Sequence, residues 1–445
     1  MAKEKMEALV PVEEQPYPVP GNWQWTYVST GYNVTSSKRV HKEDWLSEGI
    51  PFFRTRELVK LSEDGFVDNE LFISSQLYEL CKKEYGVPQV GDLLISGVGT
   101  IGVPYVVKDK TPFYFKDGNV IWFQDKGVFV ANYIYYLYKT VFMQNQIHEM
   151  SSGTTVDTYT IINAKRTLIP VPPLPEQQRI VDRIESLFTK LDEAKEKAQA
   201  VVDGFEDRKA AILHQVFTGE LTEVWRKQNN SEQFRKTVTI KRICSSLAYG
   251  TASKSSKEGK VAVIRMGNLQ GGEIDWNNLV YSNNEADNIK YALSAGDVLF
   301  NRTNSAEHVG KTAIYRGEIP AIYAGYLIKL DYDHSIIQGE YLNYLLNSPE
   351  AREYCKKVKT DAVNQSNINA QKIGAFEIPL IGMDEQEEIC RIAKKMIEAE
   401  RMIKDAAQNS IQQINTMKKA ILARAFRGEL GTNDPSEPPV DIDIS

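Results

Sequence analysis

Two glycine-containing segments have residue spacings that could cradle the phosphates of a cofactor or nucleotide. Residues 97–102 (GVGTIG) fit the G-x-G-x-x-G pattern of dinucleotide sites, and residues 305–312 (SAEHVGKT) end like a P-loop. Both kinds of site need a helix directly after the loop, because the helix N-terminus binds the phosphate. Here VPYVV and AIYRGEIP follow, which are typical of strands, and Ser305 stands where a P-loop requires glycine. We therefore predict two turns that bind no cofactor.

The sequence also lacks the residue sets that adenine methylation, disulfide formation and metal binding require. No Asn/Asp-Pro-Pro-aromatic motif is present, and residues 347–350 (NSPE) lack its shape and its aromatic residue. No two cysteines form a C-x-x-C pair, so we expect four reduced thiols, at Cys81, Cys244, Cys355 and Cys390. The scattered histidines form no ligand cluster: His41, His148, His214, His308 and His334. The sequence therefore predicts no catalytic residue, no metal and no cofactor in this chain.

The chain contains an internal repeat. Residues 169–221 open with IPVPPLPEQQRI and close with RKAAILHQVFTGEL, and residues 378–430 open with IPLIGMDEQEEI and close with MKKAILARAFRGEL. Ile169 and Ile378 are 209 positions apart, and so are Leu221 and Leu430. A constant offset over the whole stretch indicates two copies of one structural unit.

The repeat extends upstream more loosely. Residues 49–58 (GIPFFRTREL) parallel residues 260–269 (KVAVIRMGNL), and VGDLLIS at 90–96 parallels AGDVLFN at 295–301. Short runs of β-branched and aromatic residues, punctuated by Gly, Pro, Asn and Asp, predict mostly-β globular parts of roughly 150 residues. Short helices are expected around residues 133–149 and 339–359. A helical segment of roughly 45 residues follows each globular part, so the fold class is α+β.

The helical segments carry an apolar heptad pattern. Residues 176–216 contain no proline and one glycine, Gly204, and predict a single helix of about 40 residues. The seam of the first copy comprises Ile180, Ile184, Leu187, Leu191, Ala194, Ala198, Val201, Phe205 and Ile212. That of the second comprises Ile389, Ala393, Met396, Ile403, Ala407, Ile414 and Ile421. We expect the two helices to pack on each other as an antiparallel coiled coil; the alternative is that each packs only on its own globular half.

These observations divide the chain into seven segments. Pro175 and Asp384 suit helix starts, and Gly219 and Gly428 suit helix ends. The segments are an N-terminal arm (1–22), a first globular domain (23–173), a central helix (174–222), a linker (223–237), a second globular domain (238–383), a distal helix (384–428) and a flexible acidic tail (429–445).

Several of these segments resemble one known family. IPVPPLPEQQRIVDRIESLF, followed by AILHQVFTGELT, resembles the central region of Type I restriction-modification specificity subunits (HsdS). PYPVPGNWQW near the start and AGDVLFNRTNSAEHVGKTAIY in the second half are also similar to that family. The second copy departs from the family pattern where MDEQEEI replaces the proline-rich LPEQQRI.

The resemblance implies a non-catalytic, sequence-specific DNA-binding subunit. Each globular half would be a target recognition domain for one half of a bipartite double-stranded DNA site, and the helices would hold the two at a fixed distance. Two methyltransferase (M) subunits would dock along the helices and carry S-adenosylmethionine. Restriction/translocase (R) subunits would join them for cleavage.

Base edges are read by Arg, Lys, Asn, Gln, Ser and Thr side chains, which we expect in loops between strands. In the first half the candidates are Lys38, Arg39, Arg54, Arg56, Thr100, Thr154 and Thr155. In the second half they are Lys254, Arg265, Asn268, Arg302, Asn304, Asn364, Gln365 and Asn367. The alternative for each is a solvated surface residue with no DNA contact.

The bulk composition agrees with a soluble protein. The 445 residues are 42% hydrophobic and 25% charged, and no apolar run approaches the length of a membrane span. The N-terminal residues lack the apolar core of a signal peptide, so we expect a cytoplasmic protein. A net charge of −6 predicts weak DNA binding by the isolated chain or a need for a partner. The alternative function is a non-enzymatic two-domain β-module on a coiled-coil stalk that binds another ligand.

Overall fold

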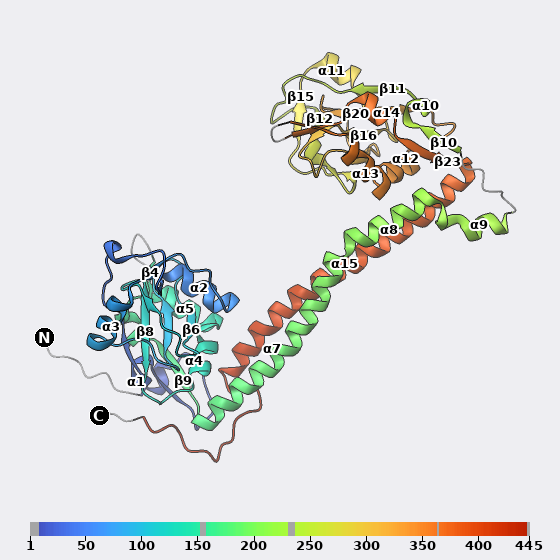
Figure 1. The fold of residues 1–445 in the computed structure, drawn as a ribbon. Helices are drawn as coiled ribbons and strands as arrows, with labels where there is room; N and C mark the ends of the chain where they lie inside the picture. Colours follow the sequence, from blue (N-terminus) through green and yellow to red (C-terminus); the bar gives the residue numbers. More distant parts are fainter. Residues whose placement is uncertain (1–8, 152–156, 230–235, 363–364, 443–445) are drawn as a thin grey trace. The chain divides into compact units, whose positions relative to one another are not determined.

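The computed structural model describes residues 9–151, 157–229, 236–362 and 365–442 (Figure 1). The chain divides into two compact units: unit 1 contains residues 1–197 and 410–445, and unit 2 contains residues 198–409. Each unit holds one globular part together with one end of each long helical segment. Within the described residues no helix combines the length and the apolar character needed to cross a bilayer.

The globular part of unit 1 is built on three small sheets. The largest has the strand order β2-β8-β5-β6 and is antiparallel throughout. Its strands are Tyr32–Thr35, Val120–Asp125, Leu93–Ser96 and Pro104–Val106. The others are β4-β3-β7 (Phe72–Ile73, Ile50–Phe53, Tyr114–Phe115) and β1-β9 (Gln24–Tyr27, Leu168–Val171). The helices are α1 (Val28–Gly31), α2 (Thr55–Asp64), α3 (Ser75–Glu84), α4 (Ala131–Tyr138), α5 (Val141–Ser151) and α6 (Ile161–Lys165).

Unit 2 repeats this architecture with additions. Its main sheet has the order β11-β20-β16-β18-β14-β13 (Cys244–Tyr249, Leu327–Tyr332, Val298–Asn301, Thr312–Ile314, Gly272–Ile274, Leu269–Gln270). The sheets β15-β12-β19 (Val280–Ser282, Val261–Ile264, Ala321–Tyr323) and β10-β23 (Lys236–Thr239, Glu377–Leu380) match those of unit 1. A further sheet, β17-β22-β21, comprises Thr303–Asn304, Gln365–Asn367 and Thr360–Ala362. The globular helices are α10 (Ile240–Ile243), α11 (Glu285–Lys290), α12 (Gly339–Leu346), α13 (Pro349–Val358) and α14 (Ala370–Gly374).

The two units share local details as well as strand order, as the sequence repeat predicts. In each unit the central strand of the three-stranded sheet, β3 or β12, is followed directly by an arginine. Arg54 in unit 1 and Arg265 in unit 2 each precede the next helical turn as its N-cap residue. Glu57 and Asn268 stand three residues later and accept a hydrogen bond from the backbone N–H of that arginine, at 3.0 and 2.9 Å. The helices expected around residues 133–149 and 339–359 are present, each as a pair of shorter helices.

Each long helix starts with a buried glutamine that ties it to its globular part. Gln177 in α7 (Leu174–Asp203) accepts from the backbone N–H of Val130, and Gln386 in α15 (Met383–Ala425) accepts from that of Gln338, both at 2.8 Å. Each amide also donates to the carbonyl five residues before it, at 3.0 and 2.9 Å. Both side chains are fully buried. The repeated Glu-Gln pair therefore fixes where each helix leaves its domain.

Each adjacent glutamate binds a residue that follows the other long helix. Glu176 accepts from Trp23 and from Asn433, both at 2.9 Å, in unit 1. Glu385 in unit 2 accepts from Thr222 at 2.7 Å and forms a buried ion pair with Arg226. In unit 1 the start of α7 therefore meets the segment after α15, and in unit 2 the start of α15 meets the segment after α8 (Phe205–Thr218).

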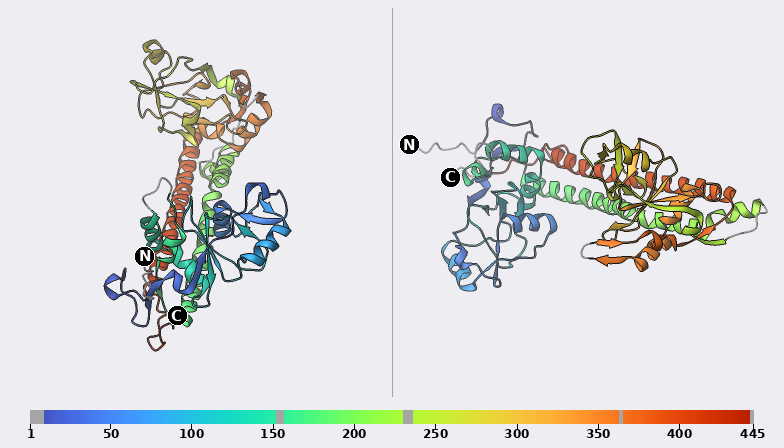
Figure 2. Two further views of the ribbon diagram at one scale, coloured as in Figure 1. Left: turned by 90° about the vertical axis from the view of Figure 1, so that its left-hand side faces the viewer. Right: turned by 90° about the horizontal axis from the view of Figure 1, so that it is seen from above.

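The long helical segments pack antiparallel within each unit, and in unit 2 α8 (Phe205–Thr218) lies beside the first part of α15 in both figures (Figures 1 and 2). In unit 2, Arg208 bonds Glu400 at 2.6 Å and the amine of Lys404 lies 4.7 Å from the centre of the Phe205 ring. In unit 1 the amine of Lys418 pairs with Asp192. The helix ends also enter the domain cores, so each packs on its own globular part and on the other helix.

The first long helix that the sequence predicts is present and is bent at one residue, Gly204. It ends as α7 at Asp203 and resumes as α8 at Phe205. Gly204 between them has ψ of −1°, far from the helical −42°, although the Arg208 N–H still bonds its carbonyl at 3.1 Å. Glycine has the weakest helix preference after proline, which accounts for a break at this residue.

The apolar seam also needs correction, at Ala194 in the first copy, which is exposed, and at two positions in the second copy. Most predicted seam residues are buried or half-buried, namely Ile180, Ile184, Leu187, Leu191, Val201, Phe205, Ile212, Ile389, Ile414 and Ile421. Met396 and Ile403 are instead 37% and 49% exposed, and Ile397 takes the inward position with 8% exposure. From Ala393 to Ala425 the inward positions of α15 are spaced alternately four and three residues apart, so the helix keeps the heptad period. One of its two sets of seam positions lies one residue later than predicted.

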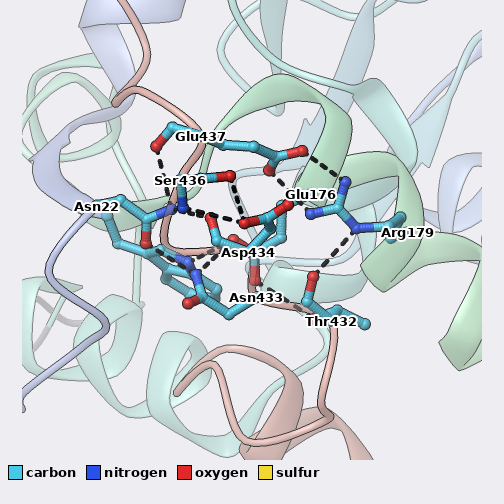
Figure 3. Close-up of polar contacts among 9 residues, drawn as sticks. Asn22, Glu176, Arg179, Thr432, Asn433, Asp434, Ser436 and Glu437 are labelled. Atoms are coloured by element: carbon cyan, nitrogen blue, oxygen red, sulfur yellow. Dashed lines mark hydrogen bonds and ion pairs between the residues drawn. The ribbon is translucent and has the colours of Figure 1, made fainter.

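The acidic tail, predicted to be flexible, is held against unit 1 (Figure 3). The guanidinium of Arg179 donates to both carboxylate oxygens of Glu437 at 2.8 Å, and Asn22 donates to the carbonyl of Asp434 at 2.9 Å. The side chain of Ile442 is 9% exposed. The polar, proline-rich composition of the tail predicts flexibility, because composition alone does not show that Arg179 and Asn22 bind it. The linker, likewise, begins as a helix, α9 (Glu223–Gln228), which supplies Arg226.

Candidate nucleic-acid interface

In unit 2, several of the predicted DNA-reading residues gather along the small sheet β17-β22-β21. Asn304 lies on β17, and Gln365 and Asn367 lie on β22, which pairs with β17 in antiparallel register. The amide of Asn367 donates to the hydroxyl of Thr303 at 2.8 Å. Gln365 is exposed. Amide and hydroxyl groups of this kind match the donor and acceptor pattern of base edges.

Arg302 precedes β17 and is positioned by a stacking contact. Its guanidinium carbon lies 4.7 Å from the centre of the Tyr249 ring, and its backbone N–H and carbonyl bond Tyr326 and Ile368 at 3.1 and 2.8 Å. The buried Nε of Arg302 has no hydrogen-bond partner within the described residues. An arginine that is fixed by stacking and retains a free donor suits recognition of an acceptor on a ligand.

Beside Arg302 lies an open cleft of about 440 Å³. Its lining includes Thr251, Ser253, Ser255, Thr303 and Tyr326. Burial raises the pKa of Tyr326, and the nearby charge of Arg265 opposes that rise, so the phenol stays a neutral donor at pH 7. Lys254 is exposed in the loop that carries the two serines. Hydroxyl groups therefore line the cleft beside the stacked arginine.

Asn268 is buried and holds a turn. Its side chain is 4% exposed, and its amide donates to the carbonyls of Asp275 at 2.8 Å and Asn277 at 3.2 Å. Because its oxygen also caps Arg265, all of its polar atoms are engaged in holding a turn. Arg265 itself donates to the carbonyl of Asn278 at 2.5 Å and keeps a buried, unpartnered Nε within the described residues.

The candidates of unit 1 are largely engaged in ion pairs. Arg54 donates twice to Glu57, at 2.7 and 3.1 Å, and Arg56 bonds both Glu57 and Glu70. Burial acts to raise the pKa of Glu57, but the hydrogen bonds and charges of the two arginines outweigh it and hold that pKa below its ordinary value. Arg54 therefore supports the helix start, and Arg56, at 56% exposure, has more freedom to meet a ligand.

Three further candidates of unit 1 lie at the surface. Arg39 pairs with Asp117 at 3.1 Å, Lys38 lies with its amine 5.1 Å from the centre of the Tyr85 ring, and Thr100 is exposed in the turn after β5. Thr154 and Thr155 in unit 1, and Asn364 in unit 2, lie outside the described residues.

Sequence reasoning missed the aromatic part of the unit 2 site. Tyr249 and Tyr326 read as ordinary strand residues, because the sequence holds 22 tyrosines and nothing distinguishes these two. The only available signal was the position of Tyr249 at the end of a strand, directly before glycine.

The two glycine-containing segments are turns followed by strands, as predicted. Residues 97–102 lead into β6, with Gly99 and Gly102 at φ of 81° and 76°, and residues 305–311 lead into β18. Within the described residues no cluster of three or more His, Cys, Asp or Glu side chains is placed to hold a metal ion.

Comparison with known proteins gives a consistent result. A family model described as the Type I restriction modification DNA specificity domain matches residues 33–202 and again residues 235–413. The chain is 26% identical over 314 residues to the Type I restriction enzyme EcoKI specificity subunit of Escherichia coli (strain K12), covering 69% of this chain and 68% of that one. It is 30% identical over 213 residues to the putative Type I restriction enzyme MjaX specificity subunit of Methanocaldococcus jannaschii, covering 47% of each.

Two solved structures are similar in fold. A chain from a study of complex assembly and conformational transition of the type I R-M system gives a TM-score of 0.71 at 18% identity, covering 93% of this chain and 100% of that one. The HsdS subunit from Thermoanaerobacter tengcongensis gives a TM-score of 0.59 at 18% identity, covering 94% and 100%.

Proposed function

Because the chain belongs to the Type I restriction-modification DNA specificity family, we propose that it reads a bipartite DNA site, one half-site with each globular part. As a specificity subunit it recruits methyltransferase and restriction subunits to that site. The two-copy match to the family model favours this function over a β-module for another ligand. We further propose that it is cytoplasmic and supplies no catalytic residue, and that two methyltransferase subunits, each with S-adenosylmethionine, act on the DNA it selects.

The observation that carries this proposal is a shared scaffold with different reading edges. The strand orders β2-β8-β5-β6 and β11-β20-β16-β18 correspond. In unit 2 the third strand of this order, β16, is followed by Arg302, which stacks on Tyr249, and by the three-stranded sheet β17-β22-β21. At the matching place in unit 1 the described residues show a single bridge between Val98 and Thr158. A common framework that presents different side chains suits two different half-sites.

The long helices are the proposed docking surface for the methyltransferase subunits. Both helices repeat the same starts and ends, so one kind of partner can bind twice through equivalent surfaces. On α15 the side chains of Met396, Met402 and Ile403 are exposed, at 37%, 71% and 49%. Large apolar residues that stay exposed together are typical of a protein–protein contact.

The test is a half-swap. Residues 23–173 are replaced by the matching segment of a related subunit with a known target, the variant is co-expressed with its methyltransferase partner, and methylated bases are mapped by genomic sequencing. One half-site changes and the other stays; the reciprocal swap of residues 238–383 changes the second half-site alone. If both halves change in either swap, or the co-expressed complex methylates no bipartite motif, the proposal is wrong.

A further inference from the structure

A second cleft in unit 2 carries a concentration of positive charge that the reading edge does not include. It encloses about 450 Å³ and lies between the loop 305–311 and α13. Lys311 from the loop end and Arg352 and Lys356 from α13 line it, with Glu206 and Glu307 as the acidic residues. None of the three cations forms an ion pair with a carboxylate of the described residues.

The charges of Lys311 and Arg352 repel each other, and Lys311 is half-buried, whereas Arg352 and Lys356 are exposed. Lys311 is held by one hydrogen bond to the side-chain oxygen of Gln270, at 3.0 Å. Burial lowers the pKa of the Lys311 amine, and the charge of Arg352 lowers it further, while Glu206 acts in the opposite direction. An anion placed between these side chains relieves both effects, so the cleft is built for a negatively charged ligand.

The two walls of the cleft run directly into the candidate reading edge. The loop 305–311 continues from β17, and α13 is followed after Lys359 by β21. Asn301, the residue before Arg302, pairs with the far end of the loop, since its N–H donates to the Lys311 carbonyl at 2.8 Å and its carbonyl accepts from Gly310 at 2.8 Å. A duplex whose base edges meet Arg302 therefore has phosphates of the same groove close to the cleft.

Unit 1 provides an internal comparison. Ser96 makes the same two bonds with Val103 and Gly102 that Asn301 makes with Lys311 and Gly310. Gly102 lies against Ile147 in the same way that Gly310 lies against Cys355, so Ile147 and Cys355 are equivalent positions. Counting along each helix from these positions aligns Gln144 with Arg352 and His148 with Lys356. The three cations are thus replaced by valine, glutamine and histidine on an equivalent scaffold. They are not needed for the fold, and a methyltransferase docked equally on both units would not use them.

We propose that this cleft of unit 2 binds the DNA phosphate backbone next to the half-site that unit 2 reads. The proposal rests on the DNA-reading function above and adds to it a sequence-independent anchor that unit 1 lacks. Lys311, Arg352 and Lys356 neutralise phosphates and read no base. Unit 2 therefore contributes more than unit 1 to the salt-dependent part of the affinity.

The test uses the co-purified complex with methyltransferase and a fluorescein-labelled 40-base-pair duplex of unrelated sequence, titrated from 50 to 250 mM KCl. Releasing three phosphate contacts lowers the slope of log K against log salt by about 2.7. We expect this loss in the triple variant Lys311→Gln, Arg352→Gln, Lys356→Gln, with the methylated genomic motif unchanged. The matched control is Lys357→Gln, on the same helix but paired with Glu353 at 2.6 Å, which leaves the slope unchanged.

The outcomes separate the possibilities. Arg352→Lys keeps the slope, because lysine neutralises a phosphate equally well, and this shows that charge and not folding is measured. An unchanged slope in the folded triple variant overturns the phosphate anchor. Loss of methyltransferase on gel filtration assigns the cleft to a protein partner instead and also overturns it. If the wild-type complex methylates no defined motif, the DNA-reading proposal itself fails, independently of the slope.

Discussion

The register of α15 can be tested by making one substitution at two positions of the same helix. Ile397→Ala and Ile403→Ala remove the same three carbon atoms, and the small gain in helix propensity is the same at both sites. The structure leaves Ile397 8% exposed and Ile403 49% exposed, whereas the heptad pattern of the sequence places Ile403 on the buried seam.

The expected magnitudes follow from burial. Truncating a buried isoleucine to alanine costs roughly 2–5 kcal/mol, because the transfer free energy is lost and a cavity remains. Roughly half of the Ile403 side chain is already in water, so its loss costs about 1 kcal/mol, and the better helix propensity of alanine offsets about 0.4 kcal/mol of that. The two variants should therefore differ in unfolding free energy by about 2 kcal/mol.

The assay is urea unfolding followed by circular dichroism at 222 nm, fitted with separate transitions for the two units, since a chain of this size need not unfold in one step. Ile397→Ala lowers the midpoint of one transition, and Ile403→Ala leaves both midpoints nearly unchanged. Methyltransferase binding is measured in parallel. It weakens for Ile403→Ala if the exposed apolar residues of α15 (Met396, Met402 and Ile403) form the docking surface. Equal destabilisation by the two substitutions would refute the shifted register and restore the one that the sequence predicts.

Three further predictions concern polar contacts. Arg226→Met leaves the buried Glu385 carboxylate without its cation and costs about 3–5 kcal/mol, seen as a lower Tm, while adding Glu385→Leu restores most of the loss; a double variant no more stable than Arg226→Met contradicts the pairing. Arg179 lowers the pKa of Glu437 by hydrogen bonding and charge, so the stabilising contact is present above the ordinary glutamate pKa of about 4.3 and is lost as pH falls through the lowered value. Limited proteolysis should cut the tail in acid in the wild type and at every pH in Arg179→Ala. A tail that resists the protease equally in both proteins would show that the Arg179–Glu437 contact does not hold it. Arg302→Ala should relax the methylated motif in the unit 2 half-site by about 1–3 kcal/mol of discrimination, whereas Asn268→Ala should lower stability and leave the motif intact; an unaltered motif in Arg302→Ala removes that arginine from base reading.

The sequence predicts the elements that depend on local patterns. The constant offset between Ile169 and Ile378 identifies the repeat, and the glycine-rich segments are correctly assigned to turns because strand-like residues follow them. The matched arginines, Arg54 and Arg265, follow from the looser alignment of the globular halves.

What the sequence misses depends on contacts between distant positions. Asn268 has the residue type of a base reader, and only its burial against Asp275 shows a structural role. The basic cleft joins Lys311 with residues of α13 about forty positions later, and no spacing rule connects them. One set of seam positions in α15 lies one residue later than predicted, because Lys404 packs over the ring of Phe205 and takes the inward place that the apolar pattern gives to Ile403.

The division of the chain into units has a consequence for its synthesis on the ribosome. Unit 2 is complete once residue 409 has been made, but unit 1 also needs residues 410–445. Leu422 and Phe426 from that final segment are buried in the unit 1 core beside Ile180, Ile184 and Tyr133. At roughly 5–20 residues per second, the first domain waits about 10 to 45 s with these apolar side chains uncovered. The N-terminal half of this protein, although made first, is therefore the last to finish folding, and it is the half that most needs protection from aggregation during translation.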